Sequence, residues 1–91
     1  MNASSRMLQV FCLDVGQGDS TFILPPDNAP PILFDCKDAH VARMFVRNRP
    51  APIVELSAVV FSHLDDDHIA GGHQFIEDFL SEGGRIRYVY L

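Results

Sequence analysis

The chain is organised around residues 62–72, which carry the sequence SHLDDDHIAGG. This segment follows an apolar run at residues 56–61 and precedes residues 75–80, whose apolar side chains recur at helical spacing. The pattern predicts a strand, a short loop and the start of a helix. Two histidines and three aspartates lie within six residues of this junction. Because imidazole and carboxylate groups are metal-ligand types, we predict that the loop holds part of a metal site.

The composition fits one small globular domain, with 91 residues of which 47% are hydrophobic and 21% charged. The net charge of −5 argues against a permanent nucleic-acid-binding surface, which is usually basic. Nucleic acid remains open as a substrate, because bound divalent cations would reverse the local charge. The polar start of the chain is not a signal peptide, and no run reaches the roughly 18 apolar residues of a membrane span. We therefore expect a soluble, cytoplasmic protein without a membrane partner.

Apolar runs and chain breakers predict an α/β fold with the order β-β-β-α-β-α-β. Strands are expected at residues 7–15, 20–24, 32–36, 55–62 and 85–91, and helices at residues 38–49 and from 67 or 68 to 82. The opening strand pair should be antiparallel and the helix-linked strands parallel, which makes a mixed sheet. Residues 1–6 form a polar tail before a domain at residues 7–91. The last expected strand runs to the final residue without a cap, so we expect the domain to be truncated there.

The sequence also predicts the burial of the first strand and of the two cysteines, and the residues that cap the helices. Residues 7–15 are apolar at nearly every position, which is typical of a strand buried on both faces. Cys12 and Cys36 lie in strand-like runs and are expected to be buried free thiols. Asp38 is expected to cap the first helix, and Gly83 with Gly84 the second.

The candidate metal ligands fall into two sets. His63 and Asp65 are two residues apart at a strand exit, so they face the same side and could reach one ion. Asp67 and His68 are adjacent at the helix start and would serve a second ion, while Asp66 should point to solvent. The alternative is an acidic helix start with Asp67 as its cap. That alternative explains one or two aspartates but neither histidine.

Other polar residues have supporting or structural interpretations. Asp35 ends a strand that should neighbour the metal strand, and we expect its carboxylate to brace the metal loop; the alternative is a solvated turn aspartate. Asp14 and Asp19 flank a glycine-containing turn and either do the same or form an Asx-type turn. His40 and His73 are expected on the surface.

Two adjacent glycines follow the metal loop. Gly71 and Gly72 lie within the expected second helix, where each costs about 1 kcal/mol relative to alanine. That cost indicates close backbone packing under the loop, with a kinked first turn as the alternative.

These motifs resemble the metallo-β-lactamase fold superfamily. The usual metal loop of that superfamily is His-x-His-x-Asp-His, and here Asp65 stands at the second histidine. Residues 13–20, LDVGQGDS, and residues 32–36, ILFDC, are similar to further motifs of its ComEC-type branch, which includes hydrolase domains of DNA-uptake competence proteins. Lys37 stands where that branch usually has glycine. The resemblance covers residues 7–91.

The resemblance implies the N-terminal αββα-type half of a metallo-β-lactamase fold. It implies that His63 and Asp65 bind the first of two divalent ions, and that Asp67 and His68 bind the second. Asp67 would also be catalytic, and Asp35 would brace the loop. The family's later histidine, bridging aspartate and last histidine are absent from this sequence. The chain alone is therefore expected to bind metal weakly and to be inactive.

The parent protein is expected to be a metal-dependent hydrolase with zinc or manganese, because Asp65 is a harder ligand than histidine. The ComEC-type resemblance favours a phosphodiesterase or nuclease-like activity, with nucleic acid as a possible substrate. One alternative is a catalytically incomplete half-domain that acts by association, as a homo-oligomer or with a complementing C-terminal half. Another is a thioester or lactam hydrolase of the same fold.

Overall fold

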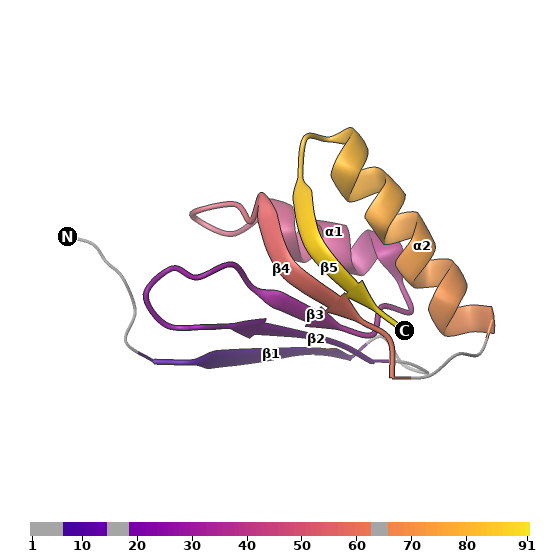
Figure 1. The fold of residues 1–91 in the computed structure, drawn as a ribbon, viewed down its shortest axis with the longest axis horizontal. Coiled ribbons are helices and arrows are strands. Elements are labelled where there is room, and N and C mark those ends of the chain that lie inside the picture. The colour runs from indigo at the N-terminus through magenta and orange to yellow at the C-terminus, as the bar shows by residue number, and fades with distance from the viewer. Residues whose placement is uncertain (1–6, 15–18, 63–65) are drawn as a thin grey trace.

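The computed structural model describes residues 7–14, 19–62 and 66–91. They form one five-stranded sheet and two helices (Figure 1). The strands are β1 (Gln9–Asp14), β2 (Asp19–Leu24), β3 (Ile32–Phe34), β4 (Glu55–Val60) and β5 (Arg85–Tyr90), and the helices are α1 (Ala39–Arg47) and α2 (Asp66–Ser81). The predicted element order is confirmed, with ends that differ by at most two residues.

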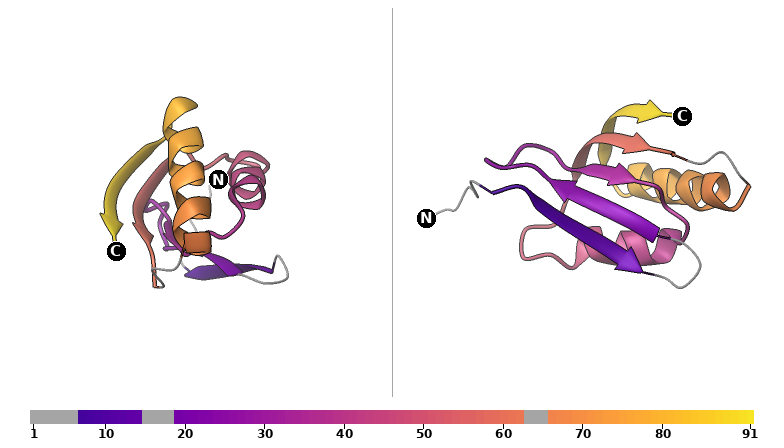
Figure 2. Two further views of the ribbon diagram at one scale, coloured as in Figure 1. Left: turned by 90° about the vertical axis from the view of Figure 1, so that its right-hand side faces the viewer. Right: turned by 90° about the horizontal axis from the view of Figure 1, so that it is seen from below.

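The strands lie in the sheet in the same order as in the chain, β1-β2-β3-β4-β5. β2 is antiparallel to β1 and β3, whereas β3, β4 and β5 are parallel to one another. The predicted mixed α/β sheet is therefore confirmed. Both helices lie on the same side of this sheet (Figure 2). Among the described residues, no helix is long and apolar enough to cross a membrane.

The core lies between the helices and one face of the sheet. Phe11, Phe22, Leu33 and Val59 are direct neighbours across four strands, and the last three are fully buried. The helices contribute buried side chains from Ala42, Val46, Phe75 and Phe79. Phe45 stacks on Phe22 with ring centroids 4.5 Å apart, which fixes α1 over the first hairpin.

The first strand differs from its prediction. β1 is an edge strand, and only its Phe11 side packs towards the core. Leu8 and Val10 are 58% and 53% exposed, and Cys12 is exposed as well. Burial on both faces was therefore the wrong expectation for this strand, and so was a buried Cys12. The Cys36 thiol is free and fully buried, as expected.

The helix ends follow their predictions, while two helix surface positions do not. The Asp38 carboxylate accepts a hydrogen bond from the Val41 N–H at 3.1 Å, which is an N-cap contact. Gly83 has φ of +93° and ends α2 as a C-cap glycine. Helical spacing predicts that Met44 and Leu80 lie on the apolar faces of α1 and α2, but both are exposed, because the helices turn Ala42, Val46, Phe75 and Phe79 inwards.

Candidate functional site

The topology gathers the predicted site segments at one end of the sheet (Figure 1). β1, β3 and β4 point their C-terminal ends to this edge, and β2 starts there because it runs the opposite way. Asp14 ends β1 and is the cross-strand partner of Asp19, which begins β2. Asp35 follows β3, and Ser62 follows β4 shortly before α2 begins. Segments far apart in sequence thus converge on one edge.

The carboxylate of Asp35 ties the exit of β4 to the exit of β3. Its Oδ1 accepts a hydrogen bond from the Ser62 N–H at 2.7 Å, and its Oδ2 accepts one from the Ser62 hydroxyl at 2.5 Å. The Asp35 N–H donates to the Val60 carbonyl at 2.8 Å. Asp35 has φ of +56°, a left-handed conformation that aspartate tolerates better than most residues. The residue just before His63 is therefore held by two charge-assisted hydrogen bonds.

Ser62 was not singled out by the sequence motifs. The parallel pairing of β3 with β4 is the feature that could have identified Ser62. Asp35 follows one strand directly, and Ser62 follows the next, so both leave the sheet at the same edge. A hydroxyl at that position is a natural partner for the neighbouring carboxylate.

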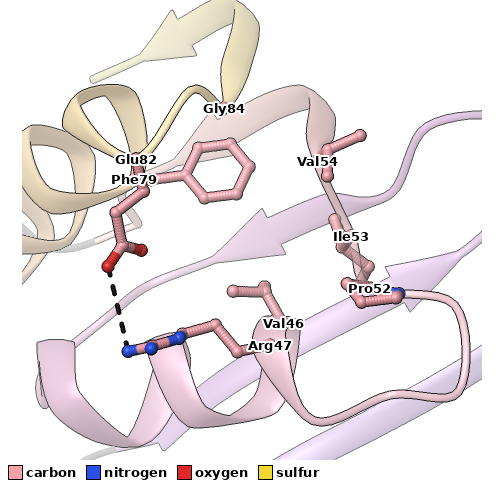
Figure 3. Close-up of a pocket in the computed structure, with 8 residues that line it drawn as sticks. All are labelled: Val46, Arg47, Pro52, Ile53, Val54, Phe79, Glu82 and Gly84. Carbon is pink, nitrogen blue, oxygen red and sulfur yellow. Dashed lines mark ion pairs between the residues drawn. The ribbon is translucent and has the colours of Figure 1, made fainter.

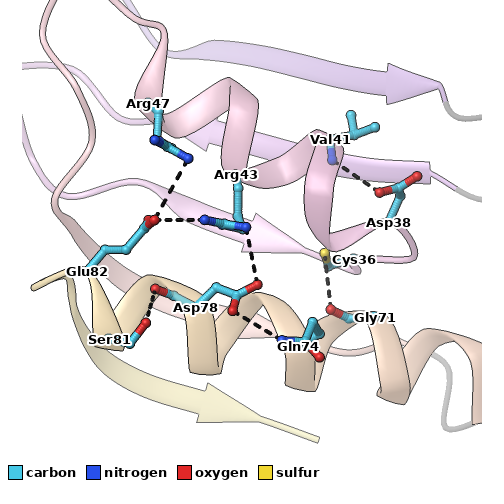
Figure 4. Close-up of polar contacts among 10 residues, drawn as sticks. All are labelled: Cys36, Asp38, Val41, Arg43, Arg47, Gly71, Gln74, Asp78, Ser81 and Glu82. Carbon is cyan, nitrogen blue, oxygen red and sulfur yellow. Dashed lines mark hydrogen bonds and ion pairs between the residues drawn. The ribbon is translucent and has the colours of Figure 1, made fainter.

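Gly71 allows α2 to pack closely against the turn that follows β3 (Figure 4), and Gly72 allows it to pack against Phe61, which follows β4. A Cβ at Gly71 would lie 2.2 Å from the Lys37 carbonyl oxygen, and one at Gly72 would lie 2.0 Å from the Phe61 ring. The Cys36 S–H donates to the Gly71 carbonyl at 3.7 Å. Burial raises the pKa of the Cys36 thiol to about 12, so this thiol is a neutral packing group.

The predicted ligands are only partly described by the structure. His63 and Asp65 lie outside the described residues. Asp67 and His68 are the second and third residues of α2, and Asp66 is the first. No three His, Cys, Asp or Glu side chains converge as a metal site among the described side chains, which leave out those of residues 1–6, 14–19 and 63–69. The ligand assignments therefore stay predictions.

The two remaining histidines lie on the surface, as predicted. His40 is exposed. The His73 side chain is 70% exposed and pairs with Glu77, one helical turn away, at 3.0 Å. Neither histidine is therefore needed to explain the candidate site.

Charge is unevenly distributed between the two ends of the sheet. Six of the 12 acidic residues belong to the described segments that enter or leave this edge: Asp14, Asp19, Asp35, Asp38, Asp66 and Asp67. Such a concentration of carboxylates favours bound cations.

The arginines near the end of α1 do not form a free basic patch. Arg43 contacts Glu82 at 2.7 Å and Asp78 at 3.5 Å, and Arg47 lies 3.8 Å from Glu82 (Figure 4). The Arg49 guanidinium lies over the rings of Phe11 and Phe45. These cations therefore hold α1 to α2 and to the hairpin, and carboxylates largely neutralise Arg43 and Arg47.

Two cavities lie at the opposite end of the sheet. One, of about 330 Å³, lies between the C-terminal ends of the two helices and is lined by Val46, Val54 and Phe79 (Figure 3). The other, of about 520 Å³, lies beside the proline-rich loop at residues 25–31. Both are lined by residues from the start of β4 or just before it, whereas the acidic edge lies beyond the end of that strand. Neither cavity coincides with the candidate site.

Comparison with known proteins identifies no family for this chain: no family model, curated protein or solved structure matches it.

Proposed function

We propose that this chain supplies one half of a dinuclear metal site in a metal-dependent hydrolase of the metallo-β-lactamase type. The observation that carries the proposal is the pair of hydrogen bonds from Ser62 to the Asp35 carboxylate. They fix the start of the segment that contains all the predicted ligands, at the edge where the acidic residues gather. A loop that must present several ligands in one geometry needs such a brace.

The donor set suits a divalent ion of intermediate hardness. His63 and Asp65 would hold one ion, and Asp67 and His68 would hold the other. Two imidazoles and two carboxylates are compatible with zinc and with manganese. Such ions supply a bound water of lowered pKa and stabilise developing negative charge. Asp67 is the proposed catalytic residue, because its carboxylate can hold the proton of the attacking water.

The other residues act by positioning. Asp35 orients the entry to the ligand segment through Ser62. Gly71 lets α2 pack against the backbone that follows β3, and this packing positions the start of α2 relative to the sheet edge. Asp14 and Asp19 add negative charge from the adjacent hairpin end.

A phosphodiester is the proposed substrate class, with nucleic acid as the leading example. The support is the ComEC-type pattern of the three motifs. The acidic edge would repel a phosphodiester in the absence of cations and accept it once cations are bound. Electrostatics at this edge therefore couples substrate binding to metal binding.

Metal binding by the purified chain tests the proposal. The chain is dialysed against zinc or manganese and then against metal-free buffer, and its metal content is measured by elemental analysis. Isothermal titration calorimetry measures weaker binding in parallel. The expected result is metal binding that the double variant His63→Ala/Asp67→Ala removes. The matched control is His73→Ala/Glu77→Ala, which deletes an imidazole and a carboxylate from an exposed pair on α2 and should retain the metal.

Because the chain alone is expected to be inactive, hydrolysis is tested separately on the metal-loaded chain combined with a complementing C-terminal half, with a chromogenic phosphodiester, a thioester and a β-lactam. Preference for the phosphodiester supports the proposed substrate class. Equal metal binding by the wild type and the His63→Ala/Asp67→Ala variant would contradict the proposed site.

A further inference from the structure

The cavity of about 520 Å³ beside the proline-rich loop, here called the Arg49 cavity, lies at the end of the sheet opposite the acidic edge (Figure 1). One wall comes from the loop at residues 25–31, and another from residues 49–55, which lead from α1 into β4. The Arg49 cavity is therefore separate from the proposed metal site, and nothing about it depends on that proposal.

The strand residues of the Arg49 cavity lie on the helix side of the sheet. Gln9 and Leu24 line it and are cross-strand partners in the first hairpin. Side chains alternate along a strand, so these two lie on the same side as Phe11 and Phe22, which pack towards the helices. In an αββα arrangement the second sheet covers the opposite face. The Arg49 cavity is therefore outside the surface that a complementing half would cover.

The guanidinium of Arg49 is held in place by two aromatic rings. Its Cζ lies 4.9 Å from the centroid of the Phe11 ring and 5.1 Å from that of Phe45. Phe45 in turn stacks on the fully buried Phe22, with ring centroids 4.5 Å apart. A guanidinium that lies over aromatic rings keeps its N–H donors at the edge of its plane. The cation is therefore positioned before any ligand binds.

Arg49 also sets the sign of the charge in the cavity. The arginines of α1 and β5 pair with carboxylates. Among the described residues, by contrast, no carboxylate lies within ion-pair distance of Arg49. Glu55 is the other charged residue of the lining, and it contacts Arg87 at 2.6 Å and Arg85 at 3.4 Å. The negative end of the α1 dipole carries only about half a charge, so the guanidinium dominates.

Backbone hydrogen bonds hold both walls of the cavity. The Pro31 carbonyl accepts hydrogen bonds from the Ser57 N–H at 2.8 Å and from the Ser57 hydroxyl at 3.2 Å. The Ile53 N–H donates to the Val46 carbonyl at 2.9 Å, which ties the second wall to α1. Four of the lining residues are prolines, whose φ is fixed by the ring. A preformed cavity of this kind loses little conformational entropy when a ligand binds.

We propose that the Arg49 cavity binds a small organic acid that carries one carboxylate on an apolar body such as an aromatic ring. The Arg49 guanidinium accommodates the carboxylate through two parallel N–H···O hydrogen bonds. The apolar body packs against Leu24, Ile53 and the prolines. Small-molecule sites commonly have volumes of about 300–1,000 Å³, a range that includes this cavity. One available cation in a mainly apolar lining favours a single negative charge over the more highly charged and strongly hydrated phosphate.

Ligand titrations of the wild-type chain, followed by ¹H–¹⁵N NMR, test the proposal. The probe is 2-naphthoate, and the neutral comparison is 2-naphthalenemethanol, which has nearly the same shape without the charge. The carboxylate should bind at least about tenfold more tightly than the alcohol, because its hydrogen bonds to a guanidinium are charge-assisted. Chemical shifts should change at the amides of Gln9, Asn28 and Val54, which line the cavity.

Substitutions at two arginines assign the contact. Arg49→Met keeps an apolar chain against the two rings and should weaken 2-naphthoate binding at least about tenfold while leaving binding of the alcohol unchanged. Arg49→Lys keeps the charge but not the planar fork and should have an intermediate effect. Arg47→Met is the matched control, because Arg47 is 56% exposed and lines the smaller cavity instead. Circular dichroism confirms that each variant remains folded.

Four results would each overturn the proposal. The first is the absence of saturable 2-naphthoate binding at millimolar concentrations. The second is equal binding of the acid and the alcohol, which would leave Arg49 without a role. The third is inorganic phosphate that binds as tightly as 2-naphthoate, which would indicate general attraction of anions. The fourth is binding that Arg47→Met weakens and Arg49→Met does not, which would place the ligand in the smaller cavity.

Discussion

Replacing Gly71 by alanine should destabilise the protein, although alanine is the better helix former. Gly71 lies inside α2, where alanine normally gains about 1 kcal/mol over glycine. A methyl group there would lie 2.2 Å from the Lys37 carbonyl oxygen and 2.6 Å from the Cys36 carbonyl oxygen. Ordinary contact begins at 3.4 Å, so α2 and the turn after β3 must separate by about 1 Å.

The size of the destabilisation by Gly71→Ala depends on which atoms must move to make room for the methyl group. The obstacle is backbone on both sides, which cannot yield by a side-chain rotation as the Phe61 ring beside Gly72 can. Overpacking of a rigid site costs about 1–3 kcal/mol, and a backbone clash belongs at the upper end. After the helix-propensity gain, we expect Gly71→Ala to lower the free energy of unfolding by about 1–2 kcal/mol.

Urea unfolding monitored by circular dichroism measures this change, and equal m-values would show that the unfolded states are comparable. Ala70→Gly is the matched control, because Ala70 is exposed on the same helix turn and should lose only about 1 kcal/mol of propensity. A stabilising Gly71→Ala, by the amount that propensity alone supplies, would refute the close approach of α2 to the Cys36–Lys37 backbone.

Three further predictions concern named contacts. Asp35→Ala should lower the free energy of unfolding by about 2–3 kcal/mol, because two hydrogen bonds are lost and alanine is strained in the left-handed conformation. Asp35→Gly should lower it less, because glycine adopts that conformation freely. In a double-mutant cycle with Ser62→Ala, measured by urea unfolding, the effects of the two substitutions should not add. The pKa of Cys36 is raised from 9.0 to about 12 in the folded state, so the neutral thiol's contribution to the free energy of unfolding is fully present below about pH 9 and is lost as pH rises towards 12. Across that range the free energy of unfolding should fall by up to about 1.4 kcal/mol per pH unit, and Cys36→Ala should lack this fall. Asp38→Ala removes the cap bond to Val41 and should cost about 1 kcal/mol in thermal unfolding, with Asp38→Asn close to wild type.

The order of the elements could be predicted because each one carries a local signal. Prolines end the strand before residue 25 and the helix before residue 50, and Asp38 and Gly83 mark helix ends by short-range chemistry. The helix-linked strands are parallel because crossovers of that length favour it. These features depend on residues close together in sequence, so a single sequence is enough to find them.

Burial and contact partners depend on distant segments and were harder to predict. Residues 9–14 are apolar enough for a central strand, yet β1 is at the edge and its Val10 side is exposed. The sequence predicts that the Asp35 carboxylate braces the metal loop; the structure shows that it accepts hydrogen bonds from Ser62, a partner that depends on the register between β3 and β4. The metal ligands remain a prediction from the motif at residues 63–68.

The coincidence of sheet order with chain order has a consequence for how the protein is made. Each strand pairs with the strand that precedes it, so every segment leaving the ribosome meets a partner already synthesised. The β1–β2 hairpin and β3 can assemble first, and α1 can then close over them through Phe45. The two parallel additions come later and require longer loop closures, which makes them the slower steps. Assembly can therefore proceed from the N-terminus as a growing sheet, without an early strand waiting unpaired for a distant one.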